Sequence, residues 1–565
     1  MATFSEALKE HYLNRPQMPA VQLLQAGKPD QEVSYQELIH ASMGYVKAYQ
    51  ADGIQAGEVV VLILEHGVDL LSAYFGAVLQ GAIPAIMPFL TEKLLPERYR
   101  ADLAALVAVT QPAAIVTYPD FEAEVRAALK PGQDSVRAVI VSDNSHPPCP
   151  PDFDTLEGLN RKPEDIAILQ HSSGTTGLQK GVALSHQAVF NQLESYRRAI
   201  RLRDDDVFVS WLPLYHDMGL IACFLMPILL GIPLVLMSPF DWVRAPYRLL
   251  RAVSDHGGTL SWLPNFAYNF CAQKIRDRDL DGVDLASWRG VINCSEPMRW
   301  ESHQAFYERF KGYGLRYQAL QTCYAMAENV FAVTQGGVDQ AVVVEEIDRE
   351  SLQNDRIARP TNAEDRKVKM LSAGKAIANT SIRILDGQGN ELPDRHIGEV
   401  AIKSNCMLTG YYHRPQETAK AFLDGWYLSG DLGYLSEAGE LFITGRKKDL
   451  IIVGGKNIHP QDIELLAFEV PGIHPGRAVA FGVYNDSLGT EDVVVVAEVE
   501  SGAEQERLKI GDQLRQTVSR GSAIALRYIH LVDSNWLVKT SSGKTARSAN
   551  KEKFLDEMKA KGIAY

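Results

Sequence analysis

The stretch Ser172–Val182, SSGTTGLQKGV, combines three glycines, two serines, two threonines and one lysine. It follows Ile166–Leu169, IAIL, which reads as a buried strand. Glycines let backbone N–H groups approach phosphate oxygens, hydroxyls donate hydrogen bonds to them, and a lysine offsets their charge. The Walker A spacing is absent here and also at Gly543–Thr545, where Val538 occupies the place of the first glycine. The stretch alone therefore predicts either a phosphate site or an ordinary turn.

Strand-like runs alternate with helix-like segments around this stretch. Val59–Leu64 (VVVLIL) and Ala114–Thr117 (AIVT) are rich in β-branched residues, whereas Ala101–Val109 and Phe121–Leu129 have helical patterns. Strands separated by helices are typical of parallel sheets that helices cover. The sequence therefore predicts an α/β fold built of layers.

The pattern changes near residue 376, where short strands are separated by turn pairs such as Asp386-Gly387 and Ala438-Gly439. Such pairs join antiparallel strands, so we expect a small barrel-like β subdomain over residues 376–445. A compact α+β pattern begins after the charged stretch Gly445–Asp449. We predict an N-terminal domain at 1–445 and a small C-terminal domain at 446–565. Because 565 residues exceed what one hydrophobic core usually spans, two domains agree with the length.

The composition is that of a globular protein. Apolar residues make up 46% and charged residues 22% of the chain, and the formal net charge of −13 repels nucleic acid and anionic lipid. The six cysteines are scattered, with no pair at metal-ligand spacing. We therefore expect a reducing, cytoplasmic compartment. The N-terminal residues lack the apolar core of a signal peptide.

One apolar stretch, Gly219–Met237, is nearly long enough to span a bilayer. However, Pro227, Gly231 and Pro233 interrupt it. We interpret it as a buried helix, a turn and a buried strand, because strands buried on both faces are continuous apolar runs. No transmembrane segment is expected.

The phosphate-type stretch is the first of six motifs that together resemble the adenylate-forming superfamily, which includes acyl- and aryl-CoA ligases, adenylation domains, luciferases and fatty acyl-AMP ligases. The other motifs are LYHDMG at Leu214–Gly219, QTCYAMAE at Gln321–Glu328, YLSGDLG at Tyr427–Gly433, GRKKD at Gly445–Asp449 with GGKNIHPQDIE at Gly454–Glu464, and TSSGKTAR at Thr540–Arg547. They occur in the superfamily's order. One motif could arise by chance, but six in order identify a member of the superfamily.

The resemblance implies a large domain, a mobile C-terminal lid, and a reaction in which a carboxylate attacks ATP, expels pyrophosphate and forms an acyl-adenylate. Positioning and charge neutralisation carry such a reaction. Residues implied in ATP or AMP binding are Ser172, Ser173, Gly174, Thr175, Thr176, Gly177, Lys180, Ser295, Glu296, Pro297, Thr322, Cys323, Tyr324, Ala325, Met326, Asp431 and Arg446. The implied acyl pocket contains His216, Met218, Gly219, Asn265 and Phe266. Thr175 and Glu328 are the implied Mg²⁺ ligands, Lys544, His216 and Glu328 the implied catalytic residues, and Lys448 the implied hinge.

Each residue also has an ordinary structural interpretation. Asp431 in Ser-Gly-Asp is typical of a turn, and Lys544 of a solvated surface. Glu328 is typical of a charge at a helix N-terminus, and His216 of a buried core histidine. The order of the motifs favours function instead, with Lys544 as a point charge that bridges the carboxylate and the α-phosphate.

Several features favour the fatty acyl-AMP ligase branch, and hence a medium- or long-chain fatty acid. Tyr215–Gly219 and Pro264–Tyr268 resemble that branch. The charged segment Asp348–Met370 lies where that branch carries an insertion that packs on the large domain and restrains the lid; its alternative is a tolerated surface loop. In contrast, Gly454–Pro460 (GGKNIHP) is closer to the CoA ligases, and Ala325 replaces a usual glycine.

Two acceptors therefore stay open: the phosphopantetheine thiol of an acyl carrier protein, which we favour, and free CoA. An amino-acid adenylation domain is disfavoured, because no aspartate is convincingly placed to hold a substrate ammonium, although Asp217 is a candidate. A catalytically silent nucleotide-binding protein is also disfavoured, because Lys544, Glu328 and Asp431 are all present.

Overall fold

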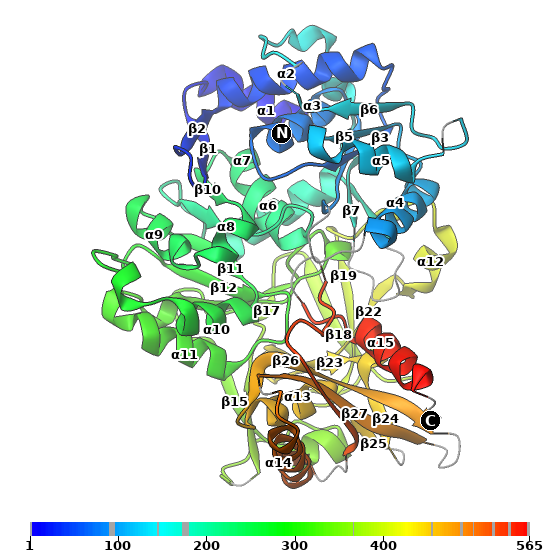
Figure 1. Ribbon diagram of the computed structural model, residues 1–565. Coiled ribbons are helices and arrows are strands. Elements are labelled where there is room, and N and C mark those ends of the chain that lie inside the picture. The colour runs from blue at the N-terminus through cyan, green and yellow to red at the C-terminus, as the bar shows by residue number, and fades with distance from the viewer. Residues whose placement is uncertain are drawn as a thin grey trace. The chain divides into compact units, whose positions relative to one another are not determined.

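The computed structural model describes residues 3–89, 96–130, 132–143, 146–171, 180–364, 366–453, 456–485, 490–500, 502–522, 526–540 and 544–561. Its contacts divide the chain into two compact units (Figure 1). Unit 1 comprises Met1–Val343, Leu371–Ser381 and Ile402–Trp426, and unit 2 comprises Val344–Met370, Ile382–Ala401 and Tyr427–Tyr565. Residues of the predicted β subdomain thus belong to both units. The boundary at residue 446, which concerns a moving lid, stays a prediction.

A mostly parallel sheet forms one layer of unit 1, in the order β13-β12-β11-β9-β10-β1-β2. Its strands are β1 Pro19–Leu24, β2 Gln31–Ser34, β9 Phe208–Ser210, β10 Leu234–Met237, β11 Leu260–Leu263, β12 Gly290–Cys294 and β13 Leu320–Cys323. Only the edge strand β2 pairs antiparallel within this sheet as described. Every residue of β9 to β13 is buried, as parallel strands covered on both faces require.

A second parallel sheet of unit 1 has the order β4-β3-β5-β6. Its strands are β3 Val59–Ile63, β4 Ile83–Ile86, β5 Ala114–Thr117 and β6 Ala138–Val141. Helices of unit 1 include α1 Phe4–Asn14, α2 Tyr35–Ala51, α3 Val68–Leu79, α4 Pro96–Thr110, α5 Glu122–Ala128, α6 His186–Ala199, α9 Tyr247–Asp255, α10 Asn265–Lys274 and α11 Trp300–Phe310. Helices α2 and α3 lie side by side (Figure 1). The predicted α/β layers are confirmed.

The apolar stretch Gly219–Met237 folds as a buried helix, a turn and a strand. A π-helical segment, Met218–Leu225, runs into α7, Met226–Leu230. The chain then turns at Gly231, whose φ of 74° suits glycine, and enters the buried strand β10. No helix among the described residues is long and apolar enough to cross a membrane.

The C-terminal part of unit 2 is a sheet in the order β26-β27-β28 that carries helices on both faces. Its elements are β24 Ile451–Val453, β25 Lys456–Ile458, α13 Pro460–Phe468, β26 Ile473–Asn485, β27 Thr490–Val499, α14 Glu504–Ser522, β28 Leu526–Val532 and α15 Arg547–Ala560. Alternate residues of β27 face opposite cores, because side chains alternate along a strand. Val495 packs with α13 and α14, and Val494 packs with Phe554 of α15.

The charged segment Asp348–Met370 also belongs to unit 2. It lies mostly between β15, Val344–Asp348, and β16, Lys367–Leu371, which pair with each other. Its Leu352 and Ala358 share a core with Tyr434 and Phe442 of β22, Trp426–Leu435, and β23, Leu441–Arg446. Strands β18, Thr380–Leu385, and β19, Gly398–Ser404, continue this sheet, and most of their residues belong to unit 2. The segment is therefore packed rather than a loose surface loop.

Candidate active site

The predicted phosphate stretch connects the two strands of an antiparallel hairpin. Strand β7, Ile166–His171, pairs with β8, Gly181–Ser185, so that His171 lies opposite Gly181. The strand expected before the stretch is confirmed. The predicted phosphate ligands Ser172, Ser173, Gly174, Thr175, Thr176 and Gly177 lie outside the described residues. Lys180, at the start of β8, is described and is about one-third exposed.

Tyr411 joins Lys180 to Glu328, the predicted metal ligand. The Tyr411 hydroxyl donates to Glu328 Oε1 at 2.9 Å, and Lys180 Nζ lies 4.5 Å from the centre of the tyrosine ring. Lys180 Nζ is also 3.1 Å from Glu417 Oε2 on α12, Pro415–Lys420. Tyr411 thus contacts both Lys180, a cation suited to phosphate, and Glu328, a carboxylate suited to a metal.

The turn that carries Glu328 is strained. Val330, two residues on, has a φ of 61°, which a β-branched residue rarely adopts. Asn329 holds the turn, because its buried side-chain amide donates to the Ala332 carbonyl at 2.7 Å and accepts from the Ser404 hydroxyl. Such strain persists only where neighbouring contacts enforce it.

Two segments predicted to form the acyl pocket and the adenine site are brought together in unit 1. His216 Nδ1 lies 2.6 Å from Asp217 Oδ1, and the Met218 N–H donates to the same carboxylate oxygen at 2.8 Å. The Ser295 hydroxyl lies 3.7 Å from Met218 Sδ, and Ser295 has a φ of 70°. Gly219 is required by a close approach, because a Cβ atom would lie 2.2 Å from the Pro213 carbonyl oxygen.

Glu296 and Asn265 act as structural links at the N-terminus of α10. The Phe266 N–H donates to Glu296 Oε2 at 2.9 Å, which is favourable at the positive end of a helix. Asn265 Oδ1 accepts from Asn293 Nδ2 and from the Arg299 N–H, each at 3.0 Å. The predicted acyl-pocket residue Asn265 therefore has a positioning task, and Pro297, next to Glu296, is exposed.

The predicted ATP- or AMP-binding residues Thr322–Met326 run from β13 into a tight turn. Thr322 and Cys323 are buried in the strand, and burial raises the pKa of the Cys323 thiol. The Tyr324 N–H donates to Thr334 Oγ1 at 3.2 Å. Ala325 forms a bridge with Ala332, and the Met326 N–H donates to the Phe331 carbonyl at 2.9 Å. Antiparallel bonds thus fix the whole motif.

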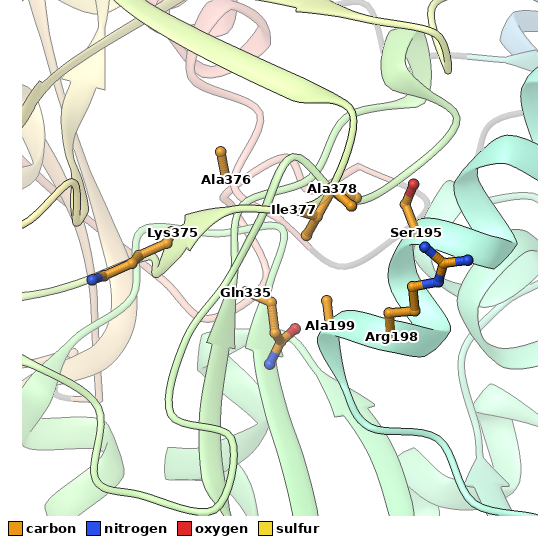
Figure 2. Close-up of a pocket in the computed structure, with 8 residues that line it drawn as sticks. All are labelled: Ser195, Arg198, Ala199, Gln335, Lys375, Ala376, Ile377 and Ala378. Atoms are coloured by element: carbon orange, nitrogen blue, oxygen red, sulfur yellow. The ribbon is translucent and has the colours of Figure 1, made fainter.

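A shallow pocket of about 300 Å³ lies elsewhere in unit 1 (Figure 2). It is lined by Ser195, Arg198 and Ala199 of α6, Gln335, and Lys375 to Ala378. Gln335 Nε2 donates to Gln321 Oε1 at 3.1 Å, and its Oε1 accepts from the Tyr196 hydroxyl at 3.0 Å. None of the predicted site residues lines this pocket.

Unit 2 brings together Asp431 and Arg446, two of the residues implied in ATP or AMP binding. Asp431 of β22 lies opposite Arg446 of β23, and Arg446 Nε donates to Asp431 Oδ1 at 3.0 Å. Lys447 Nζ lies 2.7 Å from Glu399 Oε2. Lys448, the predicted hinge, is exposed, as a residue that absorbs a backbone rotation can be.

Lys544 and Thr540 are bonded to each other, and the backbone beside them is held by a buried side chain. The Thr540 N–H donates to the Lys544 carbonyl at 2.7 Å, and the Lys544 N–H donates to Thr540 Oγ1 at 3.1 Å. Below them the fully buried Asn550 accepts from the Val538 N–H and donates to the Val538 and Ala546 carbonyls, each at 2.8 Å. The backbone on both sides of Lys544 is therefore held in place.

Arg547 ties this part of the chain to the hinge segment. Its guanidinium donates to Asp449 Oδ2 at 3.0 Å, Glu464 Oε1 at 2.6 Å and the Ala480 carbonyl at 2.8 Å. Asp449 directly follows Lys448 in the chain. An arginine bonded to two carboxylates remains charged. Arg547, three residues after Lys544, and Asp449, the residue after the predicted hinge, are thus parts of one bonded network.

The donor set around Glu328 fits Mg²⁺. Among the described residues no group of three or more His, Cys, Asp or Glu side chains could form a protein cage for a metal. Mg²⁺ instead takes one or two carboxylates together with substrate phosphates. Glu328 is half-buried, and its Oε1 accepts a hydrogen bond from Tyr411; a carboxylate has further lone pairs that can bind a cation.

Comparisons with known proteins agree with this arrangement. The family model described as "AMP-binding enzyme" matches residues 8–412. The medium-chain-fatty-acid–[acyl-carrier-protein] ligase JamA of Moorena producens (strain JHB) is 30% identical over 95% of this chain and 92% of its own. A Caulobacter vibrioides (strain NA1000 / CB15N) relative whose name assigns it to the acyl-CoA synthetases is 29% identical over 94% of this chain and 91% of its own. A structure from a study of fatty acyl-adenylate ligases of E. coli and L. pneumophila has a TM-score of 0.89 and 29% identity, and covers 99% of this chain and 98% of that one.

The fold, together with these similarities, is that of an ATP-dependent acid-activating enzyme. The chain belongs to the AMP-binding enzyme family, and its similarity to fatty acyl-adenylate ligases confirms the predicted superfamily, fold and enzyme class. The roles of the individual residues stay predictions.

Sequence reasoning missed Tyr411 and Glu417, which contact predicted site residues, and Asn550, which bonds to the backbone on both sides of Lys544. Tyr411 and Glu417 lie in GYYHRPQET, where Pro415 at the start of α12 was the available signal. Asn550 is the sole polar residue among the buried residues of α15, and a buried asparagine in a helix calls for nearby partners.

Proposed function

We propose that this protein activates a medium- or long-chain fatty acid in two half-reactions. In the first, a carboxylate oxygen attacks the α-phosphorus of ATP. The bond from that phosphorus to the oxygen leading to the β-phosphate breaks, pyrophosphate leaves, and acyl-AMP forms. In the second, the thiol of a carrier protein's phosphopantetheine loses its proton and attacks the acyl carbonyl carbon. AMP leaves, and a thioester remains.

The observation that carries this proposal is the meeting of Lys180 and Glu328 at Tyr411 beside the phosphate stretch. A transferring phosphate group needs positive charge on its oxygens and a held metal. Lys180 supplies the first. Glu328 would hold Mg²⁺, which offsets phosphate charge when bound.

The other predicted residues complete the chemistry. Asp431 accepts hydrogen bonds from the ribose hydroxyls, and Arg446 keeps that carboxylate oriented. His216, held by Asp217, closes the path between the nucleotide and the fatty acid. Lys544 places its ammonium between the attacking carboxylate and the α-phosphate, where charge repulsion would otherwise oppose approach.

The acceptor is proposed from the relatives. JamA is named for transfer to an acyl carrier protein, which supports the carrier thiol. Free CoA is the second candidate, favoured by the name of the Caulobacter relative and by the GGKNIHP motif. We infer a cytoplasmic location, since all six cysteines are free thiols.

Exchange of labelled pyrophosphate into ATP tests the first half-reaction, with a panel of fatty acids of increasing length. We expect exchange that depends on the fatty acid, and its complete absence for every acid would leave only a silent nucleotide-binding protein. Lys544→Ala should abolish exchange while calorimetric ATP binding survives. Lys559→Ala, which removes an exposed lysine of α15, is the matched control. Parallel loss of ATP binding in Lys544→Ala would contradict the assigned role.

Dodecanoic acid with ATP and Mg²⁺, supplied either with CoA or with holo-carrier protein, tests the second half-reaction. We expect acyl-carrier formation at a rate well above acyl-CoA formation. Rapid acyl-CoA formation would favour the second candidate.

A further inference from the structure

Tyr411 lies outside the predicted motifs but contacts two residues within them, Lys180 and Glu328. Its ring lies under the Lys180 ammonium and its hydroxyl donates to Glu328. Tyr411 itself is only 7% exposed, so these contacts are shielded from water on the tyrosine side. A shielded charge contact is stronger than an exposed one.

The backbone of Tyr411 is fixed beside the strand that follows Lys180. Strand β20, Gly410–Tyr411, pairs antiparallel with β8, and Tyr411 lies opposite Val182. The Tyr411 N–H donates to Thr418 Oγ1 at 2.9 Å, and that hydroxyl donates to the Arg414 carbonyl at 3.0 Å. Strand pairing and the start of α12 therefore hold the tyrosine in one position.

Glu417 supplies a counter-ion to Lys180. Its Oε1 is 2.8 Å from Arg414 Nη1 and its Oε2 is 3.1 Å from Lys180 Nζ. Burial opposes ionisation, but the hydrogen bonds from Lys180 and Arg414 outweigh it and hold the pKa of Glu417 below its ordinary value. Glu417 is therefore a carboxylate whenever the enzyme works near neutral pH.

This carboxylate competes with phosphate. A lysine that neutralises ATP must turn its ammonium toward phosphate oxygens, which carry more charge than one carboxylate. The flexible side chain of lysine permits such an exchange of partners, whereas the ring of Tyr411 can stay under the ammonium in both arrangements.

We propose that Tyr411 is a positioning residue that sets Lys180 and Glu328 relative to each other, and that Glu417 is a resting partner of Lys180 which the phosphates of ATP displace. This inference rests on the proposed function, because it takes Lys180 as a phosphate ligand and Glu328 as the Mg²⁺ ligand. ATP binding would have to break the ion pair between Lys180 and Glu417. The Tyr411 hydroxyl would orient the Glu328 carboxylate that binds the metal.

Calorimetric titration of the full-length enzyme with ATP, without fatty acid, separates the two parts. Titrations run in excess EDTA and in excess Mg²⁺. Tyr411→Phe keeps the ring and loses the hydroxyl, so ATP affinity should fall about tenfold with Mg²⁺ and stay unchanged in EDTA. Tyr411→Leu also loses the ring, and should weaken ATP binding under both conditions.

Glu417→Gln should tighten ATP binding about two- to fivefold under both conditions, because it removes the competing charge. Tyr99→Phe, which loses a hydroxyl bond to the Pro88 carbonyl, is the control for the tyrosine variants. Glu308→Gln, which breaks an exposed pair with Lys311 on α11, is the control for the glutamate variant. Neither control should change ATP affinity.

Two further variants separate failure of this inference from failure of the proposed function. If Lys180→Met and Glu328→Gln bind ATP like the wild type under both conditions, the assignment of the phosphate and metal ligands is wrong. If they weaken binding but Tyr411→Phe matches the wild type with Mg²⁺, the positioning role is wrong. If Glu417→Gln weakens binding, the resting-partner role is wrong. Tyr411→Phe should add nothing in the Glu328→Gln background.

Discussion

Asn550→Ala tests whether holding the backbone beside Lys544 in place matters for catalysis. Asn550 is fully buried and makes three hydrogen bonds of 2.8 Å to the backbone of Val538 and Ala546. A hydrogen bond contributes about 1 kcal/mol net, so the three together give about 3 kcal/mol. Val538 and Ala546 are partly exposed, and water recovers part of the loss. We expect the local free energy of unfolding to fall by about 2–3 kcal/mol.

We expect Asn550→Ala to lower the rate of catalysis more than it lowers ATP affinity. A displacement of about 1 Å at a catalytic group can cost about a hundredfold in rate. The rate of pyrophosphate exchange should therefore fall about ten- to a hundredfold in Asn550→Ala. ATP affinity should stay unchanged, because Asn550 bonds to Val538 and Ala546, which are not among the residues predicted to bind ATP.

Hydrogen–deuterium exchange and pyrophosphate exchange measure the two effects on one sample. Peptides covering residues 526–550 should lose protection, while those of β3 and β12 should not. Asn485→Ala is the matched control in unit 2, because it removes the hydrogen bond of 2.7 Å from Asn485 Nδ2 to Asp492 at a strand end, away from Lys544 in the sequence. Reduced protection with a wild-type rate of pyrophosphate exchange would refute the reasoning.

Three other predictions concern stability and packing. Asp206→Asn should lower the free energy of unfolding, measured with urea, by about 3–5 kcal/mol, because it breaks a buried ion pair with Arg289. Burial opposes ionisation of Asp206, but hydrogen bonds from Arg289 and Thr259 outweigh it and lower its pKa. This contribution is therefore present above the ordinary aspartate pKa and is lost as the pH falls through the lowered pKa of the folded protein. The variant should lose that part of the acid dependence, and an unchanged acid profile would contradict the assignment. Gly219→Ala should lower the free energy of unfolding by at least about 1–3 kcal/mol, because the new Cβ atom would meet the Pro213 carbonyl oxygen. The rate of pyrophosphate exchange should fall with every fatty acid. Gly312→Ala is the control, because a Cβ atom there would meet no other atom within 4 Å. Arg547→Ala removes the salt-bridge partner that Asp449 and Glu464 share and should lower the melting temperature, whereas an unaltered melting temperature would show that this network does not stabilise the C-terminal part of unit 2.

The sequence by itself determined the layers, the enzyme class and the order of the motifs. β-Branched runs predict strands because their side chains fill a buried sheet, and β3, β5 and β10 appear where such runs occur. The break at Gly231 was likewise predictable, since a helix ends readily at a glycine with positive φ. Chemistry that depends on residue type within one short motif is visible in the chain itself.

Only the tertiary structure decided which distant residues serve the same group. Tyr411 contacts Glu328, 83 positions away, because β20 pairs with β8 in a particular register. It also decided that Asp348–Met370 shares a core with β22 and β23. Strand register and shared cores arise from contacts between remote segments, and local patterns carry little information about them. The motifs therefore indicate which residues carry the chemical groups, and the long-range pairing of strands determines which of these residues are in contact.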